Sequence, residues 1–245
     1  MRLEGKKVIV TGANGGVGQA ISRLFEQEGA AVAMIDRVTA SCELLAQEMK
    51  RKGRKSLVIQ ADLSRVGGIK ELVKKVKEDF GGIDILVSNA GVVERHTLEE
   101  IRPKDWDRTF NVNLKAAFFA IQAVVQYMRA QKDGRIVCIG SRASKDGGMN
   151  VGISYAASKA GLELLVKRLS RDMGSWGIRI NLIRPGAIDT PFLDDLSLEQ
   201  KEDIRKAIPL GRLCSPWEVA QAALFLASDE SSFISGAILD IAGGL

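Results

Sequence analysis

Short apolar segments alternate with longer segments of helical periodicity along almost the whole chain of 245 residues. Several short segments, such as VIV at 8–10 and ILV at 85–87, are apolar at every position. Strands that are apolar on both faces are typical of parallel sheets covered by helices. We predict strands near residues 7–11, 31–35, 56–60, 84–88, 135–140, 178–184 and 236–241. The pattern predicts an α/β fold, a doubly wound parallel sheet of seven strands with helices on both faces.

The segments between these strands carry the helical pattern. Apolar residues recur at helical spacing in 17–29, 41–53, 68–80 and 155–173, and each segment ends near Gly or a basic turn. No repeat, low-complexity stretch or linker interrupts the series, and 191–212 is the one candidate insertion. We therefore predict a single domain over 1–245, with a small substrate-loop segment at about 191–212.

Composition excludes several classes of protein. The net charge is +5, and the basic residues are scattered without an aromatic-interleaved stripe, so nucleic-acid binding is not expected. No segment approaches the roughly 20 apolar residues that span a bilayer, and the N-terminus lacks a signal peptide's apolar region. Cys42, Cys138 and Cys214 are odd in number and far apart, which argues against disulfides or a zinc site. We expect a cytoplasmic protein with no metal.

The stretch VIVTGANGGVG, residues 8–18, ends an apolar run in a glycine-rich turn. Glycine at positions 12, 16 and 18 would let a pyrophosphate approach the backbone N–H groups, and the helix beginning near Val17 would direct its positive end at the phosphates. The spacing is neither G-x-G-x-x-G nor that of a Walker loop. A tight connection without a ligand remains an alternative interpretation of this turn.

Asp36 ends the second predicted strand, eighteen residues after Gly18. An acid there can accept hydrogen bonds from both ribose hydroxyls of an adenosine, which favours a dinucleotide without a 2′-phosphate. The alternative is a turn or helix-capping aspartate. Arg37 could instead attract the 2′-phosphate, so NAD is the expected cofactor and NADP the second choice.

The chain resembles the short-chain dehydrogenase/reductase family over essentially all of its length. TGANGGVG resembles that family's T-G-x-x-x-G-x-G loop, SNAG at 88–91 its N-N-A-G, and YAASK at 155–159 its Y-x-x-x-K. RPGAIDT at 184–190 and ASDESSFISGAILDIAGG near the C-terminus are similar to two further family segments. The branch closest in appearance is that of the 3-oxoacyl carrier-protein reductases.

Tyr155 and Lys159 lie four residues apart, so both project from one face of a helix. A nearby ammonium and an oxidised nicotinamide both stabilise a phenolate and lower the pKa of the phenol. Tyr155 is therefore the expected general acid/base. The resemblance implies that Lys159 also binds the nicotinamide ribose.

Ser141 and Asn113 complete the expected catalytic set. Ser141 follows the fifth strand and would donate a hydrogen bond to the substrate oxygen, with Ser144 as a rival. By resemblance, Asn113 bends a long helix and holds a water in a proton relay from the lysine. Asn111 is a possible alternative to Asn113.

The resemblance also implies cofactor contacts. Asp62 would meet the adenine amino group, Asn89 would brace sheet and loop beside the adenosine, and Ile188 and Thr190 would hold the carboxamide. The full expected cofactor-binding set is Gly12, Asn14, Gly16, Val17, Gly18, Asp36, Arg37, Asp62, Leu63, Asn89, Ala90, Gly91, Tyr155, Lys159, Pro185, Gly186, Ile188 and Thr190.

These residues predict an enzyme that transfers hydride between NAD(H) and a small secondary alcohol or ketone. The alternatives are an NADPH-dependent 3-oxoacyl carrier-protein reductase, a sugar or polyol dehydrogenase, and a nucleotide-binding protein without catalysis. Lys132 could supply a charge for a carrier protein near the cleft, whereas Trp176 stands where another basic residue is expected. His96, the one histidine, is expected to be solvated because no acidic or cysteine partner lies at ligand spacing. By resemblance, two long helices and the last strand form a homotetramer.

Overall fold

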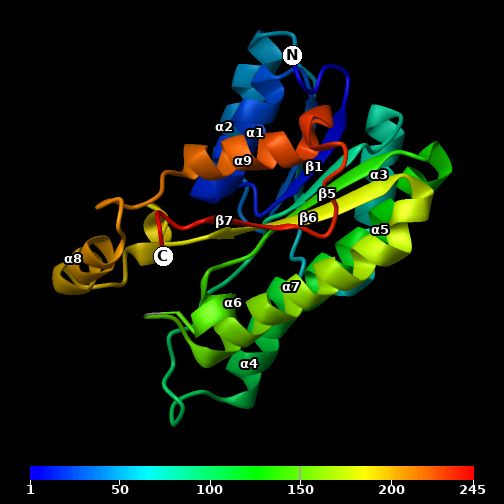
Figure 1. Ribbon diagram of the computed structural model, residues 1–245. Helices are drawn as coiled ribbons and strands as arrows, with labels where there is room; N and C mark the ends of the chain where they lie inside the picture. The colour runs from blue at the N-terminus through cyan, green and yellow to red at the C-terminus, as the bar shows by residue number, and fades with distance from the viewer. Residues whose placement is uncertain (149) are drawn as a thin grey trace.

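Seven strands form one parallel sheet in the order β3-β2-β1-β4-β5-β6-β7 in the computed structural model, which describes residues 1–148 and 150–245 (Figure 1). The strands are β1 (Lys7–Thr11), β2 (Ala31–Asp36), β3 (Ser56–Gln60), β4 (Ile85–Ser88), β5 (Gly134–Ile139), β6 (Ile178–Pro185) and β7 (Ile238–Ile241). The predicted doubly wound sheet of seven parallel strands is confirmed.

The order in which successive strands are added to the sheet reverses after β3. Strands β2 and β3 lie on one side of β1, and β4 to β7 lie on the other. Val8 is paired with Val32 of β2 on one side and with Ile85 of β4 on the other. The loops that follow β1 and β4 therefore leave the sheet in neighbouring positions and separate from one another. In doubly wound sheets, such a crevice at the carboxyl ends of the strands is where ligands bind.

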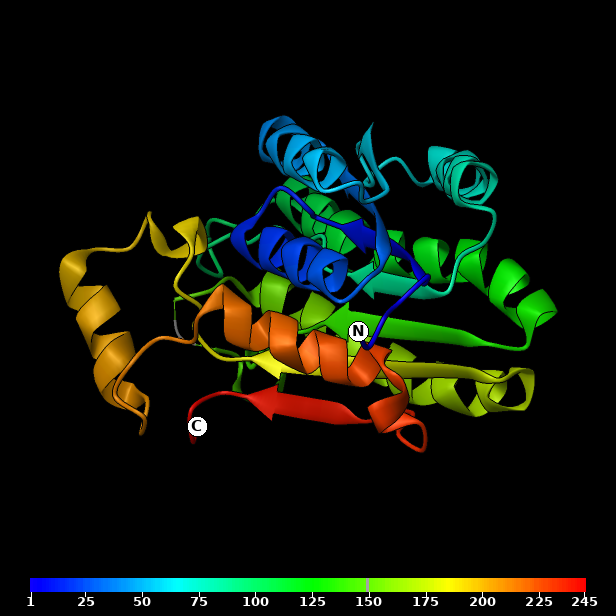
Figure 2. The same ribbon diagram turned by 90° about the horizontal axis from the view of Figure 1, so that it is seen from above.

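Helices cover both faces of the sheet, as Figures 1 and 2 show. The core on one face includes side chains of α1 (Gly16–Gln27), α2 (Ala40–Arg51) and α9 (Pro216–Ala227). The core on the other face includes side chains of α3 (Ile69–Phe80), α5 (Ala116–Gln131) and α7 (Ile153–Met173). Burial on both faces explains why the strand segments are apolar at successive positions.

The remaining helices are shorter. They are α4 (Pro103–Phe110), α6 (Ala143–Asp146) and α8 (Leu198–Ala207), with single 3-10 turns at Val66–Gly68, Gly174–Trp176, Pro191–Leu193 and Asp229–Ser231. A π-helical turn, Asn111–Lys115, joins α4 to α5. In Figure 2 the strand arrows point toward the side that carries α8, so the segment 191–212 lies beyond the carboxyl ends of the strands. Within residues 1–148 and 150–245, no helix is long and apolar enough to cross a bilayer.

Candidate active site

The glycine-rich turn packs so closely against its neighbours that two of its positions have no room for a side chain. Gly12 has a φ of 65°, and a Cβ there would lie 2.7 Å from the Cα of Ala90. A Cβ on Gly18 would lie 2.2 Å from the carbonyl oxygen of Gly12. The first turn of α1 therefore rests directly on the loop after β1. This helix begins at Gly16, one residue before the predicted start.

Asn89 and Thr11 join the glycine-rich turn to the end of β4. The Asn89 side-chain amide donates to the carbonyl oxygens of Gly12 at 2.9 Å and Thr11 at 3.1 Å. The Thr11 hydroxyl oxygen accepts the N–H groups of Asn89 at 3.0 Å and Ala90 at 3.2 Å. These bonds hold the two sides of the crevice together. The role of Thr11 had no signal in the sequence beyond its place in the motif.

Asp36 faces the glycine-rich turn from the end of β2. Its carboxylate accepts the N–H of Asn14 at 3.0 Å and the N–H of Val38 at 3.2 Å. The Asn14 side-chain oxygen accepts the N–H of Ser41 at 3.0 Å. These bonds fix the carboxylate at the edge of the crevice. Arg37 is exposed, and its side chain forms no ion pair with any residue that the structure describes.

Asp62 and Leu63 follow β3, and only one of the two is exposed. Leu63 is buried in the core below α3. Asp62 is exposed, and its carboxylate accepts the Ser64 hydroxyl at 2.7 Å and the Ser64 N–H at 3.0 Å. The hydrogen bond from the Ser64 hydroxyl holds the pKa of Asp62 below its usual value. Asp62 thus offers a fixed carboxylate, whereas the Leu63 side chain offers no surface to a ligand.

Tyr155 and Lys159 lie on the first two turns of α7 and are both buried. Their exposed fractions are 7% and 4%. The Lys159 ammonium lies 5.8 Å from the centre of the Tyr155 ring and donates to the carbonyl oxygen of Ile139 at 2.9 Å. Burial lowers the pKa of Lys159 to about 8. The bond to Ile139 positions the ammonium at the carboxyl end of β5.

Burial raises the pKa of Tyr155, and two neighbours oppose that effect. The larger opposing effect is a hydrogen bond with Ser141, and the smaller is the positive charge of Arg95. Both favour the phenolate over the neutral phenol. Burial has the larger effect, so the pKa of Tyr155 lies above its usual value in this structure, and Ser141 and Arg95 limit the rise.

Ser141, rather than Ser144, is the serine that acts on the pKa of Tyr155. The Ser144 hydroxyl donates to the backbone oxygen of Ser141 at 2.6 Å and lies against Glu163 of α7. Glu163 in turn pairs with Arg184 of β6 at 3.3 Å. Ser144 and Glu163 therefore support the loop that carries Ser141. Sequence reasoning missed Glu163, although it lies four residues after Lys159 and shares its helical face.

Asn113, not Asn111, is buried in the π-helical turn. Its exposed fraction is 1%. Its side-chain oxygen accepts the N–H of Val92 at 2.8 Å, and its amide donates to the Val92 carbonyl at 3.0 Å and to Ser158 at 3.1 Å. A Cβ on Gly91 would lie 3.5 Å from both the Asn113 side-chain oxygen and the Lys159 nitrogen. The loop after β4 thus lies directly over the Asn113–Lys159 region.

The segment after β6 lies opposite the glycine-rich turn. Pro185 ends β6, and the N–H of Gly186 donates to Ile241 of β7 at 2.9 Å. Ile188 pairs with Cys214 in a single parallel bridge. A Cβ on Gly16 would lie 2.9 Å from the methyl group of Thr190. Residues 185–190 therefore form the wall of the crevice across from α1.

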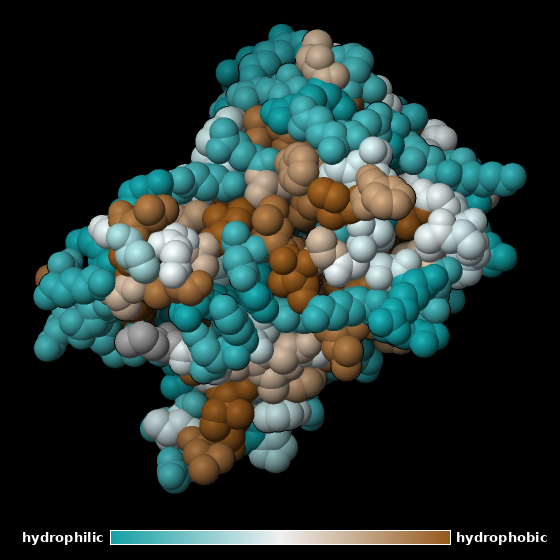
Figure 3. All heavy atoms as spheres, in the orientation of Figure 1, coloured by the Kyte–Doolittle hydropathy of each residue, from teal (hydrophilic) through white to brown (hydrophobic). Residues whose placement is uncertain are grey.

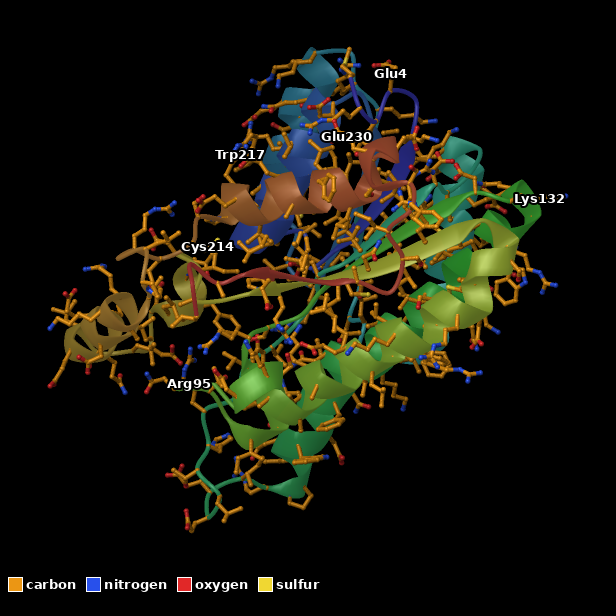
Figure 4. The ribbon with its side chains drawn as sticks, in the orientation of Figure 1. Glu4, Arg95, Lys132, Cys214, Trp217 and Glu230 are labelled. Atoms are coloured by element: carbon orange, nitrogen blue, oxygen red, sulfur yellow. The ribbon has the colours of Figure 1, made fainter. Side chains whose placement is uncertain are left out.

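The structure brings most of the expected residues to this crevice, but it contradicts the expectation for Lys132. Lys132 lies at the end of α5, just before β5 begins (Figure 4). Ser141 follows the other end of β5, so the two residues lie at opposite ends of the sheet. Trp176 precedes β6 in the same way, and Arg129 stacks on its ring at 4.6 Å. The expectation that Lys132 lies near the cleft of its own chain is therefore wrong.

His96 was expected to be solvated; its side chain is 32% exposed and lies beside two carboxylates. Its Nε2 lies 3.4 Å from a carboxylate oxygen of Glu94 and 3.8 Å from one of Asp105. Asp105 belongs to α4, so the sequence offered no sign of this contact. The neighbouring Arg95 and, from the segment after β6, Phe192 were missed entirely. The Phe192 ring lies 5.9 Å from the Tyr155 ring, and the charge of Arg95 acts on the pKa of Tyr155.

Comparison with known proteins connects this crevice to a family. Residues 12–245 match the family model described as enoyl-(acyl carrier protein) reductase. The chain is 42% identical to the 3-oxoacyl-[acyl-carrier-protein] reductase of Thermotoga maritima, over 100% of this chain and 99% of that protein.

Two solved structures are similar in fold. One is described as an NAD(P)-dependent gluconate 5-dehydrogenase from Beutenbergia cavernae with NADP bound at low occupancy, at a TM-score of 0.93 and 33% identity, covering 99% of this chain and 97% of that one. The other is a 7α-hydroxysteroid dehydrogenase with NADH and 7-oxo glycochenodeoxycholic acid, at a TM-score of 0.94 and 32% identity, covering 99% of this chain and 95% of that one. Sequence motifs, sheet order and these similarities agree: the chain belongs to the short-chain dehydrogenase/reductase family of oxidoreductases.

Proposed function

We propose that this oxidoreductase interconverts a ketone and a secondary alcohol, with Tyr155 as the group that moves the proton. The observation that carries the proposal is the burial of Tyr155 and Lys159 together behind Ser141, at the carboxyl end of β5. A buried ammonium beside a buried phenol has no structural purpose that an apolar pair would not serve better. A binding protein without catalysis would not need this arrangement.

The crevice fits a nicotinamide dinucleotide. Gly12 and Gly18 leave no side chain between the backbone and the first turn of α1, and a helix N-terminus of this kind attracts phosphate. We propose that Asp36 accepts the adenosine ribose hydroxyls, while residues 185–190 hold the nicotinamide end. When bound, such a cofactor supplies or accepts the hydride at its nicotinamide ring.

The chain's own residues would handle the proton. In the direction of reduction, Ser141 donates a hydrogen bond to the ketone oxygen, and Tyr155 transfers its hydroxyl proton to that oxygen as hydride reaches the carbon. Lys159 then stabilises the phenolate that remains. Because the pKa of Lys159 is about 8, its side chain is still largely an ammonium at neutral pH. Asn113 positions the loop at Val92 and leaves its amide fixed near this lysine.

We propose a preference for NAD over NADP. The support is the position of Asp36, whose carboxylate is fixed by Asn14 and Val38 at the end of β2. Among the two solved relatives, one holds NADP and the other NADH, so the relatives favour neither cofactor. Arg37 is exposed beside Asp36 and could turn toward a 2′-phosphate. Such a contact would make the preference for NAD smaller than Asp36 alone would give.

Two classes of compound are candidates for the substrate. The Thermotoga maritima relative favours a 3-oxoacyl thioester over the general secondary alcohol expected from the sequence. The gluconate 5-dehydrogenase similarity and the position of Arg95 favour a small hydroxy acid or oxo acid. Neither Lys132 nor Trp176 supports recognition of a carrier protein at the cleft of the same chain.

A panel of ketones tests the proposal. Acetoacetyl-N-acetylcysteamine represents the thioester class, and acetoacetate, 4-oxopentanoate and cyclohexanone represent small ketones. Each would be mixed with NADH and, separately, with NADPH while absorbance at the reduced nicotinamide band is followed. We expect NAD(P)H oxidation with at least one ketone. If no ketone of either class is reduced with either cofactor, the proposed function is wrong.

Three broader expectations remain proposals. We propose that 1–245 forms one domain, in which 191–212 packs beside the substrate. The cytoplasm remains the proposed location, on the strength of three cysteines that form no disulfide in the described part of the chain. A homotetramer is proposed as well.

The exposed apolar surface supports the tetramer. Leu164 on α7 is 70% exposed and Phe233 is fully exposed, and Figure 3 shows apolar residues gathered over β7. Faces of this kind commonly mark protein interfaces. We expect light scattering at micromolar concentration to give four times the chain mass of 26.5 kDa. A mass near 26.5 kDa would contradict the tetramer.

A further inference from the structure

Arg95 places a permanent positive charge beside Tyr155. The ring of Phe192 lies 5.9 Å from the ring of Tyr155, and the guanidinium of Arg95 lies 5.6 Å from the ring of Phe192. The charge is near enough to act on the Tyr155 hydroxyl. The Arg95 side chain is 19% exposed, so it lies partly away from water. Its charge therefore acts more strongly than a surface charge would.

Arg95 has three hydrogen-bonding partners, of which one is a carboxylate. Its Nε donates to the Asn150 carbonyl at 2.8 Å, and its Nη2 donates to the Phe192 carbonyl at 2.8 Å. These two acceptors are neutral. Within residues 1–148 and 150–245, the one carboxylate paired with Arg95 is that of Asp195, which accepts from Nη1 at 2.5 Å and is 60% exposed. An exposed carboxylate that returns readily to water is a replaceable partner.

Arg95 also lines an open cleft of about 330 Å³. The cleft has apolar walls from Val151, Ile153 and Leu196 and a polar wall that includes Gln200. No carboxylate belongs to its lining in the described part of the chain, and Arg95 is the permanent charge there. Figure 4 shows Arg95 in the space between α6 and the segment that carries α8. The volume is large enough for a small organic molecule.

We propose that Arg95 binds a carboxylate of the substrate, so that this oxidoreductase acts on short oxo acids and hydroxy acids. This inference rests on the proposed function. The substrate carboxylate takes the place of Asp195 on the guanidinium, whose planar N–H groups match a carboxylate in pairs. The ketone of the same molecule then lies at Ser141 and Tyr155. A neutral ketone or a thioester would leave Asp195 in place and gain nothing from Arg95.

The alternative role of Arg95 is a structural clamp that joins the segment after β6 to the loop at Asn150. The two roles differ in what Asp195 does. In a clamp, Asp195 assists, and Asp195→Asn would weaken the site for every substrate. In an anion site, Asp195 competes with the substrate carboxylate, and Asp195→Asn would lower KM for an acid. Asp195→Asn would therefore impair the site if Arg95 is a clamp and improve the KM for an acid if Arg95 is an anion site.

Steady-state reduction of matched ketones tests the proposal. The substrates are acetoacetate and 4-oxopentanoate, each compared with its methyl ester, in the presence of NADH or NADPH. For at least one pair, the unaltered protein should favour the acid over the ester by 10-fold or more in kcat/KM. Arg95→Gln should lower that ratio by about 10- to 100-fold, and Arg95→Lys should restore part of it. The matched control is Arg108→Gln, which removes an exposed guanidinium from the same region and should leave the ratio unchanged.

A binding measurement separates this proposal from the proposed function. Each acid is titrated calorimetrically into the protein with NAD⁺, a complex in which a ketone cannot react. We expect binding by the unaltered protein that is at least 10-fold weaker in Arg95→Gln. If an acid binds through Arg95 but neither the acids nor the other ketones of the panel are reduced, the proposed function fails and the anion site stands. Equal binding by both proteins, no binding of either acid, or an unchanged acid-to-ester ratio in Arg95→Gln overturns the anion site.

Discussion

Replacing the buried lysine of the active site should stabilise the folded protein. The pKa of Lys159 falls from an ordinary value of 10.5 to about 8 because the ammonium is buried. At about 1.36 kcal/mol for each pH unit, the difference corresponds to about 3 kcal/mol of destabilisation at neutral pH. Lys159→Met removes this penalty but leaves the carbonyl of Ile139 without its hydrogen bond, which costs about 1 kcal/mol. We expect a net gain of about 1–2 kcal/mol and loss of activity.

The sign of the pH dependence follows from the same values. Below pH 8 both the folded and unfolded chains keep the Lys159 proton, so the burial penalty is present in full. Between about 8 and 10.5 the folded chain releases the proton first, and the penalty disappears. The unaltered protein should therefore gain stability relative to Lys159→Met as the pH rises through this window.

Urea unfolding followed by tryptophan fluorescence, at one fixed protein concentration, measures the effect at pH 7 and at pH 9.5. Lys167→Met is the matched control, because it makes the same change at an exposed position of the same helix and should show no such pH dependence. The reasoning is refuted if Lys159→Met is less stable than the unaltered protein at pH 7. It is refuted equally if their difference does not shrink as the pH rises.

Two further changes probe the cofactor crevice. The Asp36 carboxylate would lie against the 2′-phosphate of NADP, a repulsion of roughly 4 kcal/mol at 4 Å and an effective dielectric of 20, so NAD should win by 10-fold or more in kcat/KM. Asp36→Ala should move that ratio toward NADP, and equal or better use of NADP by the unaltered protein would contradict the placement of Asp36 on the ribose. Gly18→Ala places a Cβ 2.2 Å from the Gly12 carbonyl oxygen. We expect this variant to lose at least about 2 kcal/mol of stability, as overpacked core positions do, and to bind NAD more weakly. Gly67→Ala is its control, because no atom lies within 4 Å of the added Cβ. Stability is measured by thermal unfolding and affinity by NAD titration. Equal losses of stability and affinity in the two variants would count against the close packing at Gly18.

The sheet could be predicted from the sequence because its five inner strands, β2, β1, β4, β5 and β6, are largely buried on both faces. An apolar run of four to eight residues leaves little choice but a parallel strand covered by helices, as at β4, where all four residues are buried. The glycine-rich turn was predictable for a similar reason. Gly12 and Gly18 are required by contacts within a local motif, so the motif itself carries the information.

The surroundings of Tyr155 were less accessible to sequence reasoning. Phe192 and Arg95 come from loops after different strands, and no local pattern indicates that they meet at the tyrosine. Lys132 shows the opposite error. It lies nine residues before Ser141, but six of the intervening residues form β5, and six residues at about 3.3 Å each span about 20 Å. Lys132 and Ser141 are close in the sequence but far apart in space, because β5 lies between them.

The most direct test of the proposed mechanism compares the two tyrosines of the chain. Tyr155→Phe removes the transferable proton and little else, whereas Tyr127→Phe makes the same change on α5, outside the crevice. Turnover of the best ketone and the Kd for NADH would be measured for both. We expect Tyr155→Phe to lose at least 100-fold in kcat, about the size of general acid catalysis, with a Kd within a few fold of normal, and Tyr127→Phe to remain active. A Tyr155→Phe protein that turns over at the normal rate would contradict the role of this residue.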